Sequence, residues 1–369
     1  MNAGTQRLYA HLSRPAIPSL NGIRALAVIL VILHHLGVTN WDLGSVGVIW
    51  FFVLSGFLIT WLLLKEHARH GRVSLKNFYI RRALRLLPAF YAFFAVYVGL
   101  TALIHRTSDV DQYIAVALYF NDYYRWIHPT DHLPMDHTWS LAVEEQFYLL
   151  WPLAALMLGW HRRRLMIALT SVIVAVSAGR VIYQLFFSGD HNVVYYSFHT
   201  RADSLAIGCL VAVLLNKATD SRVLDFVVGH WLAPGLTLSI LLLTLWMESR
   251  LGLPYQHTVG LIAWPLLLAA LMVQAIASSD SMPWRFLNME PLFTLGSWSY
   301  GAYLWHWPVD YVLINRFPAW SNLVRVPLAT AMSFGLAAAS FYIVERRFLR
   351  LKKRFSEPVA IETMAAGRA

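Results

Sequence analysis

Long runs of apolar residues constrain this chain more than any other feature of its sequence. About ten runs are long enough to cross the hydrocarbon core of a bilayer as helices, which takes roughly 20 residues. They cover residues 18–38, 45–64, 84–105, 138–159, 165–185, 200–216, 231–247, 257–277, 294–315 and 323–345. Charged residues make up only 14% of the chain and apolar residues 58%, whereas a soluble domain carries about 25% charged residues. We therefore predict an all-α fold, a polytopic membrane bundle of about ten transmembrane helices.

We predict a single membrane domain, because the sequence shows neither a repeat period nor a Gly/Ser linker between the apolar runs. We expect a short N-terminus at 1–17, a transmembrane domain at 18–345 and a basic tail at 346–369. The apolar stretch at 111–122 is too short to span and is expected to be interfacial or re-entrant. Cys209 is the single cysteine, which excludes disulfides and cysteine-rich metal sites, and no metal is expected.

Lysine and arginine gather in three short segments, the connections 65–85 and 160–164 and the tail from 346 onward. With ten spans, all three lie on one side of the membrane, opposite the acidic loop 106–137. Because cytoplasmic loops carry an excess of Lys and Arg, we predict that both termini are cytoplasmic. The formal charge of +10 is then a topology signal and does not indicate nucleic-acid binding. The 65–85 connection is also a candidate site for an anionic ligand.

Ionisable side chains inside the predicted spans are candidates for function, since each is costly in a bilayer. Arg24 and His35 of the first span are 11 residues apart, about 1100° of rotation and about 16 Å of rise, and therefore share a helix face. An imidazole is suited to proton abstraction near neutral pH, so His35 is a candidate general base. The alternative is a snorkelling arginine and an interfacial histidine.

Two further clusters point to chemistry. Arg82 and Arg85 are i,i+3 neighbours, and two guanidinium groups so placed suit a phosphate-bearing ligand, although a topology role would also explain them. Glu144 and Glu145 lie in the apolar fourth span, where carboxylates are hard to explain as packing. Their predicted depth is close to that of His35.

Two other groups have simpler explanations. Arg201 and Asp203, just inside the sixth span, are expected to form an internal ion pair, for which a structural role is favoured and contact with the substrate is the alternative. Ser55 and Gly56 of the second span are small residues that let helices approach closely, so we expect packing there.

The ninth span carries Ser299, Tyr303 and His306 at i, i+4 and i+7, which directs a hydroxyl, a phenol and an imidazole along one stripe. Polar groups from the first, fourth, sixth and ninth spans are thus expected to converge in the outer half of the bundle. A basic mouth is expected on the inner side.

The order of these residues resembles the membrane-bound acyltransferase type 3 family, which includes bacterial O-antigen and exopolysaccharide O-acetyltransferases. The match covers nearly the whole chain, and its joint order is highly specific. It rests on Leu20-Asn21-Gly22-Ile23-Arg24-Ala25-Leu26-Ala27 with His35, the run from Phe52 to Ile59, Arg82 and Arg85, Trp139-Ser140-Leu141 with Glu144-Glu145-Gln146-Phe147-Tyr148, and Ser299-Tyr300 followed by Tyr303, Leu304, His306 and Pro308.

The resemblance implies an enzyme of the bacterial inner (cytoplasmic) membrane. It would transfer an acyl group, usually acetyl, from cytoplasmic acyl-CoA to a hydroxyl of a sugar, polysaccharide or glycoside on the outer side. Arg24 and His35 match a pair needed for activity, with His35 as the favoured base. Arg82 and Arg85 match the pair associated with the CoA donor, and Glu144 matches an acidic position after Trp-Ser-Leu.

On this basis we expect His35 to remove the proton of the acceptor hydroxyl as it attacks the thioester, with Glu144 or Glu145 orienting the imidazolium. Tyr303 or Ser299 would donate to the oxyanion. Direct transfer and an acyl-enzyme intermediate both remain open.

The sequence departs from the family pattern in two places. Arg346 follows Glu345, where relatives often have proline, and no SGNH-type hydrolase domain follows the last span. The membrane domain is therefore expected to complete the transfer or to hand over to another envelope-biosynthesis protein, and a homo-oligomer is also considered. The rival functions are a proton-coupled transporter or flippase of envelope glycans, and a non-enzymatic assembly protein.

Overall fold

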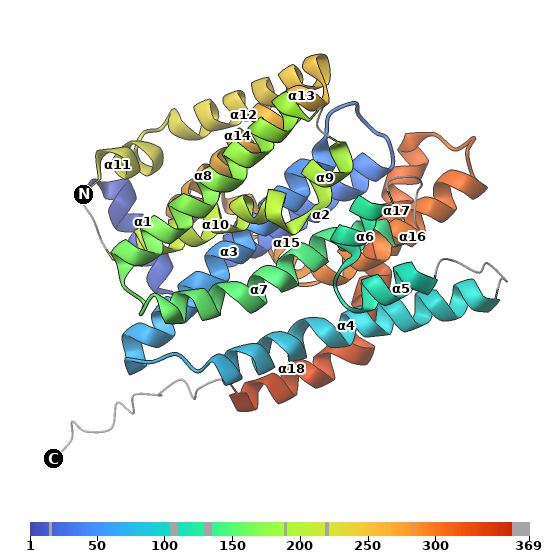
Figure 1. Ribbon diagram of the computed structural model, residues 1–369, viewed down its shortest axis with the longest axis horizontal. Coiled ribbons are helices and arrows are strands. Elements are labelled where there is room, and N and C mark those ends of the chain that lie inside the picture. Colours follow the sequence, from blue (N-terminus) through green and yellow to red (C-terminus); the bar gives the residue numbers. More distant parts are fainter. Residues whose placement is uncertain are drawn as a thin grey trace.

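The computed structural model describes residues 1–14, 17–103, 110–128, 135–187, 190–217, 221–282 and 284–355. Within those ranges the chain is helical and contains no strand, which confirms the predicted fold class (Figure 1). Parts of the acidic loop 106–137 and of the basic tail 346–369 lie outside the described residues.

Each of the predicted apolar runs coincides with one long helix. The long helices are α2 (Pro18–His35), α3 (Leu43–His70), α4 (Leu75–Leu103), α7 (Trp139–Met157), α8 (Arg162–Phe186), α10 (Phe198–Leu215), α12 (Ala233–Leu251), α14 (Leu261–Ala277), α16 (Ser299–Arg316) and α17 (Asn322–Ser340). The shorter helices include α1 (Ala3–Ser13), α9 (His191–Tyr196), α11 (Arg222–Gly229), α13 (Leu253–Tyr255), α15 (Glu290–Ser297), α18 (Arg346–Lys352), η1 (Asp136–Thr138), η2 (Gln256–Gly260), η3 (Arg285–Asn288), η4 (Phe341–Glu345) and η5 (Lys353–Phe355).

Among the described residues, seven helical stretches are long and apolar enough to cross a membrane by length and composition. They are Pro18–His35, Leu43–His70, Leu75–Leu103, Arg162–Phe186, His191–Leu215, Leu253–Ala277 and Asn322–Lys352. The bent pair α11 and α12, which meet at 88°, would make an eighth. The long helices α7 and α16 are not among these stretches, and both carry the polar side chains discussed below. The count of about ten spans therefore stays a prediction.

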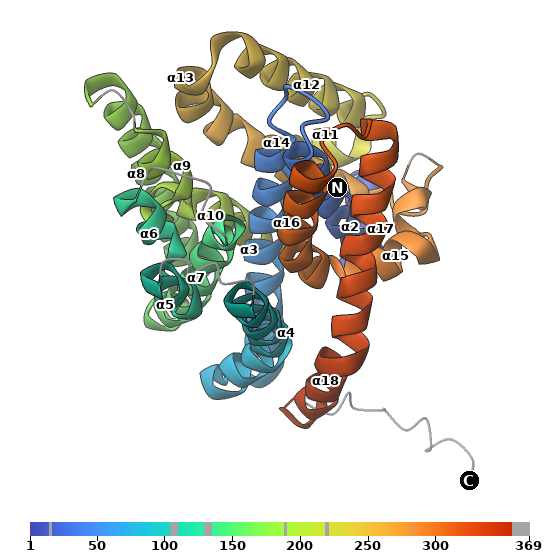
Figure 2. The same ribbon diagram turned by 90° about the vertical axis from the view of Figure 1, so that its right-hand side faces the viewer.

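The helix α3 lies near the middle of the bundle, with α2 and α10 packed along it (Figure 2). Gly56 on α3 and Gly208 on α10 make the close approach between these two helices, because a Cβ atom at either position would collide with the partner's backbone. It would meet the carbonyl oxygen of Leu205 or of Val53, respectively. The packing role predicted for Gly56 is thus confirmed, whereas the neighbouring Ser55 turns to the functional site.

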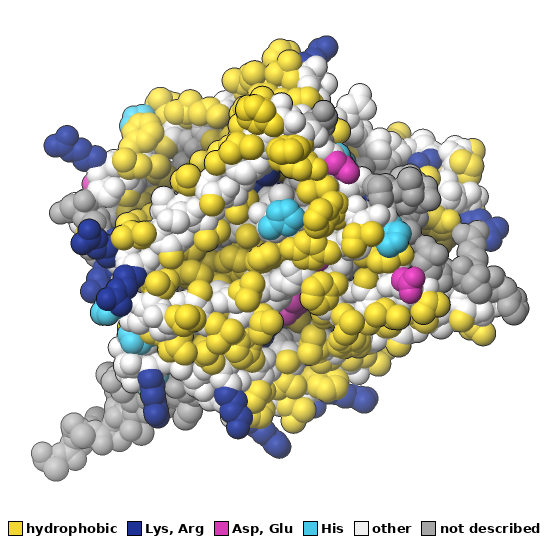
Figure 3. Space-filling view, viewed as in Figure 1, with side chains coloured by type: hydrophobic (Ala, Val, Ile, Leu, Met, Phe, Trp, Pro, Cys, Tyr) yellow, Lys and Arg dark blue, Asp and Glu magenta, His cyan; other side chains and the backbone are white. Residues whose placement is uncertain are grey.

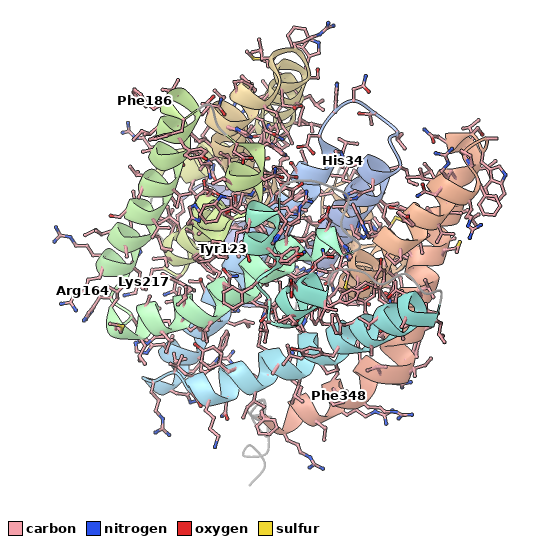
Figure 4. The ribbon with its side chains drawn as sticks, turned by 45° about the vertical axis from the view of Figure 1, so that its right-hand side comes forward. His34, Tyr123, Arg164, Phe186, Lys217 and Phe348 are labelled. Atoms are coloured by element: carbon pink, nitrogen blue, oxygen red, sulfur yellow. The ribbon has the colours of Figure 1, made fainter. Side chains whose placement is uncertain are left out.

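The face seen in Figure 3 is covered mainly by hydrophobic side chains, with Lys and Arg most frequent at its left and lower edges and a few at the top and right. Arg81 joins two of the predicted basic segments, donating to Glu66 Oε2 at 2.9 Å and to the Phe355 carbonyl oxygen at 3.0 Å. In Figure 4, Arg164 and Lys217 lie at the left edge, away from His34. The basic segments therefore gather at one end, which we call the basic end. Which side of a membrane it faces stays a prediction.

The stretch predicted to be too short for a span forms two short helices, α5 (Val110–Ala117) and α6 (Asn121–Ile127). Buried Asn121 on α6 donates to the Met135 carbonyl oxygen at 3.1 Å and to Thr138 Oγ1 at 3.0 Å. Gln146 of α7 donates to Asp122 Oδ1 at 3.0 Å. These contacts fix the start of α7, the helix that carries the predicted glutamates.

Candidate active site

A cavity of about 520 Å³ lies among α2, α3, α4, α7 and α16. Its cationic lining residues are Arg14, Arg24, Lys65, Arg82 and Arg85, and its acidic ones are Glu144 and Glu345. We call it the arginine pocket. Arg24 comes from α2 and the other two arginines of its interior come from α4, so tertiary packing brings them together.

The three interior arginines lie close enough to act on one another, and Glu144 and Glu345 are among the acidic groups that act on them. The guanidinium of Arg82 stacks on the ring of Tyr148, 3.3 Å from its centroid. The Nε atoms of Arg24 and Arg82 are buried and have no hydrogen-bond partner among the described residues. Both guanidinium groups also repel that of Arg85. Such a cluster is costly alone and is relieved by an anion, for which planar guanidinium forks are well suited.

The two glutamates are separated from the predicted base. Ser55 donates to Glu144 Oε1 at 2.8 Å, and Glu144 lines the arginine pocket. Glu145 lines neither this pocket nor the next one. No hydrogen bond joins either glutamate to His35 in the described part of the chain, so the structure does not bring together the histidine–glutamate pair expected from sequence.

A second cavity of about 380 Å³ lies at the other end of α2. Six of its lining residues are tryptophan or tyrosine, namely Trp41, Trp139, Tyr195, Tyr196, Tyr303 and Trp307. Its polar lining includes His34, His35, Asp42, His191, Glu248 and Gln256. We call it the aromatic pocket. Rings that offer apolar faces beside a few fixed polar groups are typical of sites that bind organic ligands in one orientation.

His35 lies on the wall of the aromatic pocket and is in contact with His306 of α16. His35 Nδ1 is 3.0 Å from the Val31 carbonyl oxygen and 3.3 Å from His306 Nε2, while His306 Nδ1 is 2.5 Å from the Tyr303 carbonyl oxygen. Because carbonyl oxygens only accept, this network assigns a hydrogen to Nδ1 of each ring. His306 Nε2 then shares the single Nδ1 hydrogen of His35 with the Val31 carbonyl oxygen, and Nε2 of His35 is left as the basic nitrogen.

His137 of η1 packs behind this pair, with its ring centroid 5.4 Å from that of His306. Burial lowers the pKa of His137 to about 3, so its imidazole stays neutral. Its Nε2 donates to the Leu304 carbonyl oxygen over 3.2 Å. This contact ties the start of α7 to α16.

Tyr303 marks the boundary between the two pockets, because it and Val48 line both of them. Its hydroxyl donates to the His137 carbonyl oxygen at 2.8 Å and is paired with Ser140 Oγ at 2.6 Å. Ser299, one turn earlier on α16, lines only the arginine pocket, and His306 is fully buried. The predicted stripe of Ser299, Tyr303 and His306 therefore begins in the arginine pocket, passes the boundary between the two pockets and ends at the contact between His306 and His35.

The predicted ion pair between Arg201 and Asp203 is wrong. Asp203 instead accepts from Arg180 of α8 at 2.5 Å. The Arg201 guanidinium lies among the rings of Phe52, Trp139 and Tyr195, at 5.9, 5.7 and 5.1 Å. Residues i and i+2 on a helix point about 200° apart, so they do not face each other.

Sequence reasoning also missed Asp310. This carboxylate is one helical turn beyond His306 on α16, in a predicted span, and is only 2% exposed. An ionisable residue at i+4 from a site histidine was a usable signal.

Comparison with known proteins agrees with the sequence motifs. The model of a family described as an acyltransferase domain matches residues 17–342. An O-acetyltransferase OatA of Staphylococcus aureus is 32% identical over 354 residues, which cover 89% of this chain and 57% of the relative. The peptidoglycan O-acetyltransferase OatA of Listeria monocytogenes is 33% identical over 355 residues, covering 90% and 56%.

The chain thus spans just over half the length of these curated relatives. No solved structure matches it. The family match covers most of the chain and includes α2, α3, α4, α7 and α16, which contribute residues to the two pockets. The chain therefore belongs to the membrane-bound acyltransferase type 3 family.

Proposed function

We propose that this protein transfers an acyl group, acetyl in the first instance, from acyl-CoA to a hydroxyl of a carbohydrate. The observation that carries the proposal is that two pockets of different chemistry meet at Tyr303 and Val48. His35 lies on the wall of one of them, close to that boundary. The names of the relatives, which are O-acetyltransferases, support the same reaction.

The arginine pocket suits the donor. Phosphate groups of CoA would bind Arg82 and Arg85 by charge-assisted hydrogen bonds and relieve the repulsion among the buried guanidinium groups. A volume of about 520 Å³ lies within the range of ligand sites. The thioester end would then reach toward Tyr303, and we infer that this pocket faces the cytoplasm, where acyl-CoA is found.

The aromatic pocket suits a carbohydrate acceptor. Sugar rings have apolar faces that stack on aromatic side chains and hydroxyls that donate to carboxylates. Asp42 at the start of α3 is held in place by hydrogen bonds from Ser45 and Gln256. Because the Listeria relative is named a peptidoglycan O-acetyltransferase, we take a polysaccharide as the first acceptor class to test.

The chemistry follows from the histidine network. Nε2 of His35 takes the proton of the acceptor hydroxyl, the oxygen attacks the thioester carbonyl carbon, and the C–S bond breaks. The thiolate leaves as CoA and takes up a proton. Ser299 and Tyr303 are the candidates for donating to the oxyanion. Tyr303 would first have to turn its hydrogen away from the His137 carbonyl oxygen.

The test uses the full chain, purified and reconstituted in lipid vesicles with isotope-labelled acetyl-CoA and oligosaccharide acceptors. We expect release of CoA thiol together with acetyl esters on the acceptor. Arg85→Ala should raise KM for the donor at least about tenfold, whereas Arg350→Ala, an exposed arginine of α18 at the same basic end, should not.

His35→Ala should abolish ester formation while the protein still inserts. Glycan movement across the vesicle without thiol release would favour the transporter and overturn the proposal. Wild-type transfer by the His35→Ala variant would overturn the assignment of the base.

A further inference from the structure

Asp310 on α16 is a buried carboxylate that the mechanism above does not use. It is 2% exposed, and neither of its oxygens has a hydrogen-bond partner among the described residues. Burying an unpaired carboxylate is costly, so a group in this state calls for an explanation from its surroundings.

Its neighbours are the histidine pair. One nitrogen each of His35 and His306 and one oxygen of Asp310 lie within 4.8 Å of one another. Such a set has the composition of a metal site, but the nitrogen of His35 that faces His306 is Nδ1, which donates to the Val31 carbonyl oxygen. A protonated nitrogen is not available to a metal ion. The arrangement therefore favours proton transfer among these three side chains over metal binding.

We propose that Asp310 and His306 are positioning residues that stabilise the imidazolium form of His35 during acyl transfer, an inference that rests on the proposed function. As Nε2 of His35 takes the hydroxyl proton, the Nδ1 hydrogen strengthens its bond to His306 Nε2 or moves onto it. The positive charge then lies next to the Asp310 carboxylate. When the thiolate leaves, the proton returns from the histidines to the sulfur or to water.

Asp310 is distinguished from the other groups around the histidine pair by lying within 4.8 Å of both imidazoles. The groups that act on the histidine pair are other imidazoles, His34 on α2 and His137 of η1, which add repulsion once charge appears. Of the three carboxylates that line the aromatic pocket, Glu248 of α12 has one oxygen without a partner among the described residues, whereas Asp42 and Asp136 have partners elsewhere. Asp42 accepts from Ser45 and Gln256 and lies 3.6 Å from His34, and Asp136 pairs with Arg125 at 3.1 Å.

The first test measures acyl transfer by the full chain in vesicles for Asp310→Asn, Asp310→Glu and the exposed control Asp111→Asn. We expect Asp310→Asn to lower kcat by about 10- to 100-fold with KM for acetyl-CoA unchanged, and Asp310→Glu to recover part of the loss. Without the carboxylate the imidazolium forms less readily, so the acidic limb of the pH–rate profile moves to lower pH. A purely structural role would lower the amplitude and leave that limb in place, which would overturn the inference.

The second test does not depend on turnover. Diethylpyrocarbonate modifies neutral imidazoles, and mass spectrometry follows the rate at His35 alone. At pH 8 we expect labelling of His35 to be several-fold slower in Asp310→Asn and in His306→Ala, and unchanged in Asp111→Asn. If wild-type protein releases no CoA thiol but shows this dependence, the proposed function fails while the coupling stands. Equal labelling in all variants would overturn the coupling itself.

Discussion

The pairing of Asp203 with Arg180, and not with Arg201, leads to a quantitative prediction. Arg180 is 1% exposed and connects three helices, donating to Asp203 Oδ2 and the Thr200 carbonyl oxygen, both at 2.5 Å, and to the Leu261 carbonyl oxygen at 3.0 Å. Asp203→Ala would leave this guanidinium without a counter-charge in a buried site. Removing one partner of a buried ion pair costs about 3 to 5 kcal/mol in free energy of unfolding.

Replacing both partners should cost less. The double variant Arg180→Met/Asp203→Leu carries apolar side chains of comparable size, and such replacements of buried pairs are often close to neutral. We therefore expect a coupling free energy of about 3 kcal/mol between Arg180 and Asp203. The parallel cycle with Arg201→Met should give a coupling below about 1 kcal/mol, because Arg201 is held among aromatic rings, contacts worth about 2 kcal/mol or less.

The assay is equilibrium unfolding of the purified protein in a fixed detergent mixture, followed by the fluorescence of its tryptophans. The acyl-transfer assay serves as a check that each variant is folded before unfolding. A larger coupling for Arg201 with Asp203 than for Arg180 with Asp203 would refute the pairing. So would an Asp203→Ala variant no less stable than the double variant.

Two further predictions concern packing and pH. Gly208→Ala should lower the melting temperature strongly, because its Cβ would meet the Val53 carbonyl oxygen. Gly99→Ala has open space around its Cβ and should leave the melting temperature unchanged. Equal effects of the two substitutions would contradict the close packing of α3 and α10. Burial raises the pKa of Asp122 to about 6 from 3.8, so the folded state disfavours the ionised carboxylate. The free energy of unfolding should therefore fall by about 3 kcal/mol as the pH rises from 4 through 6. Asp122→Asn should lack this decline in thermal unfolding scans at pH 4.5 and 7.5, and parallel curves for the two proteins would count against it.

The helices themselves could be read from the sequence. A chain segment in a bilayer must satisfy its backbone hydrogen bonds internally, so each apolar run of spanning length becomes a helix. All ten predicted runs coincide with long helices, including α7 and α16, which carry polar residues of the candidate site. The order of motifs along the chain also identified the family, because that order does not depend on how the helices pack.

The partners within the site were decided by tertiary structure. The period of a helix shows which residues share its face, but not which neighbour that face meets or at what depth. Arg24 joins Arg82 in one pocket, while His35 of the same helix lines the other and contacts His306. These contacts depend on the distance and the angle at which the helices cross. Both are set by the side-chain volumes at helix contacts such as Gly56, which involve residues far apart in the sequence.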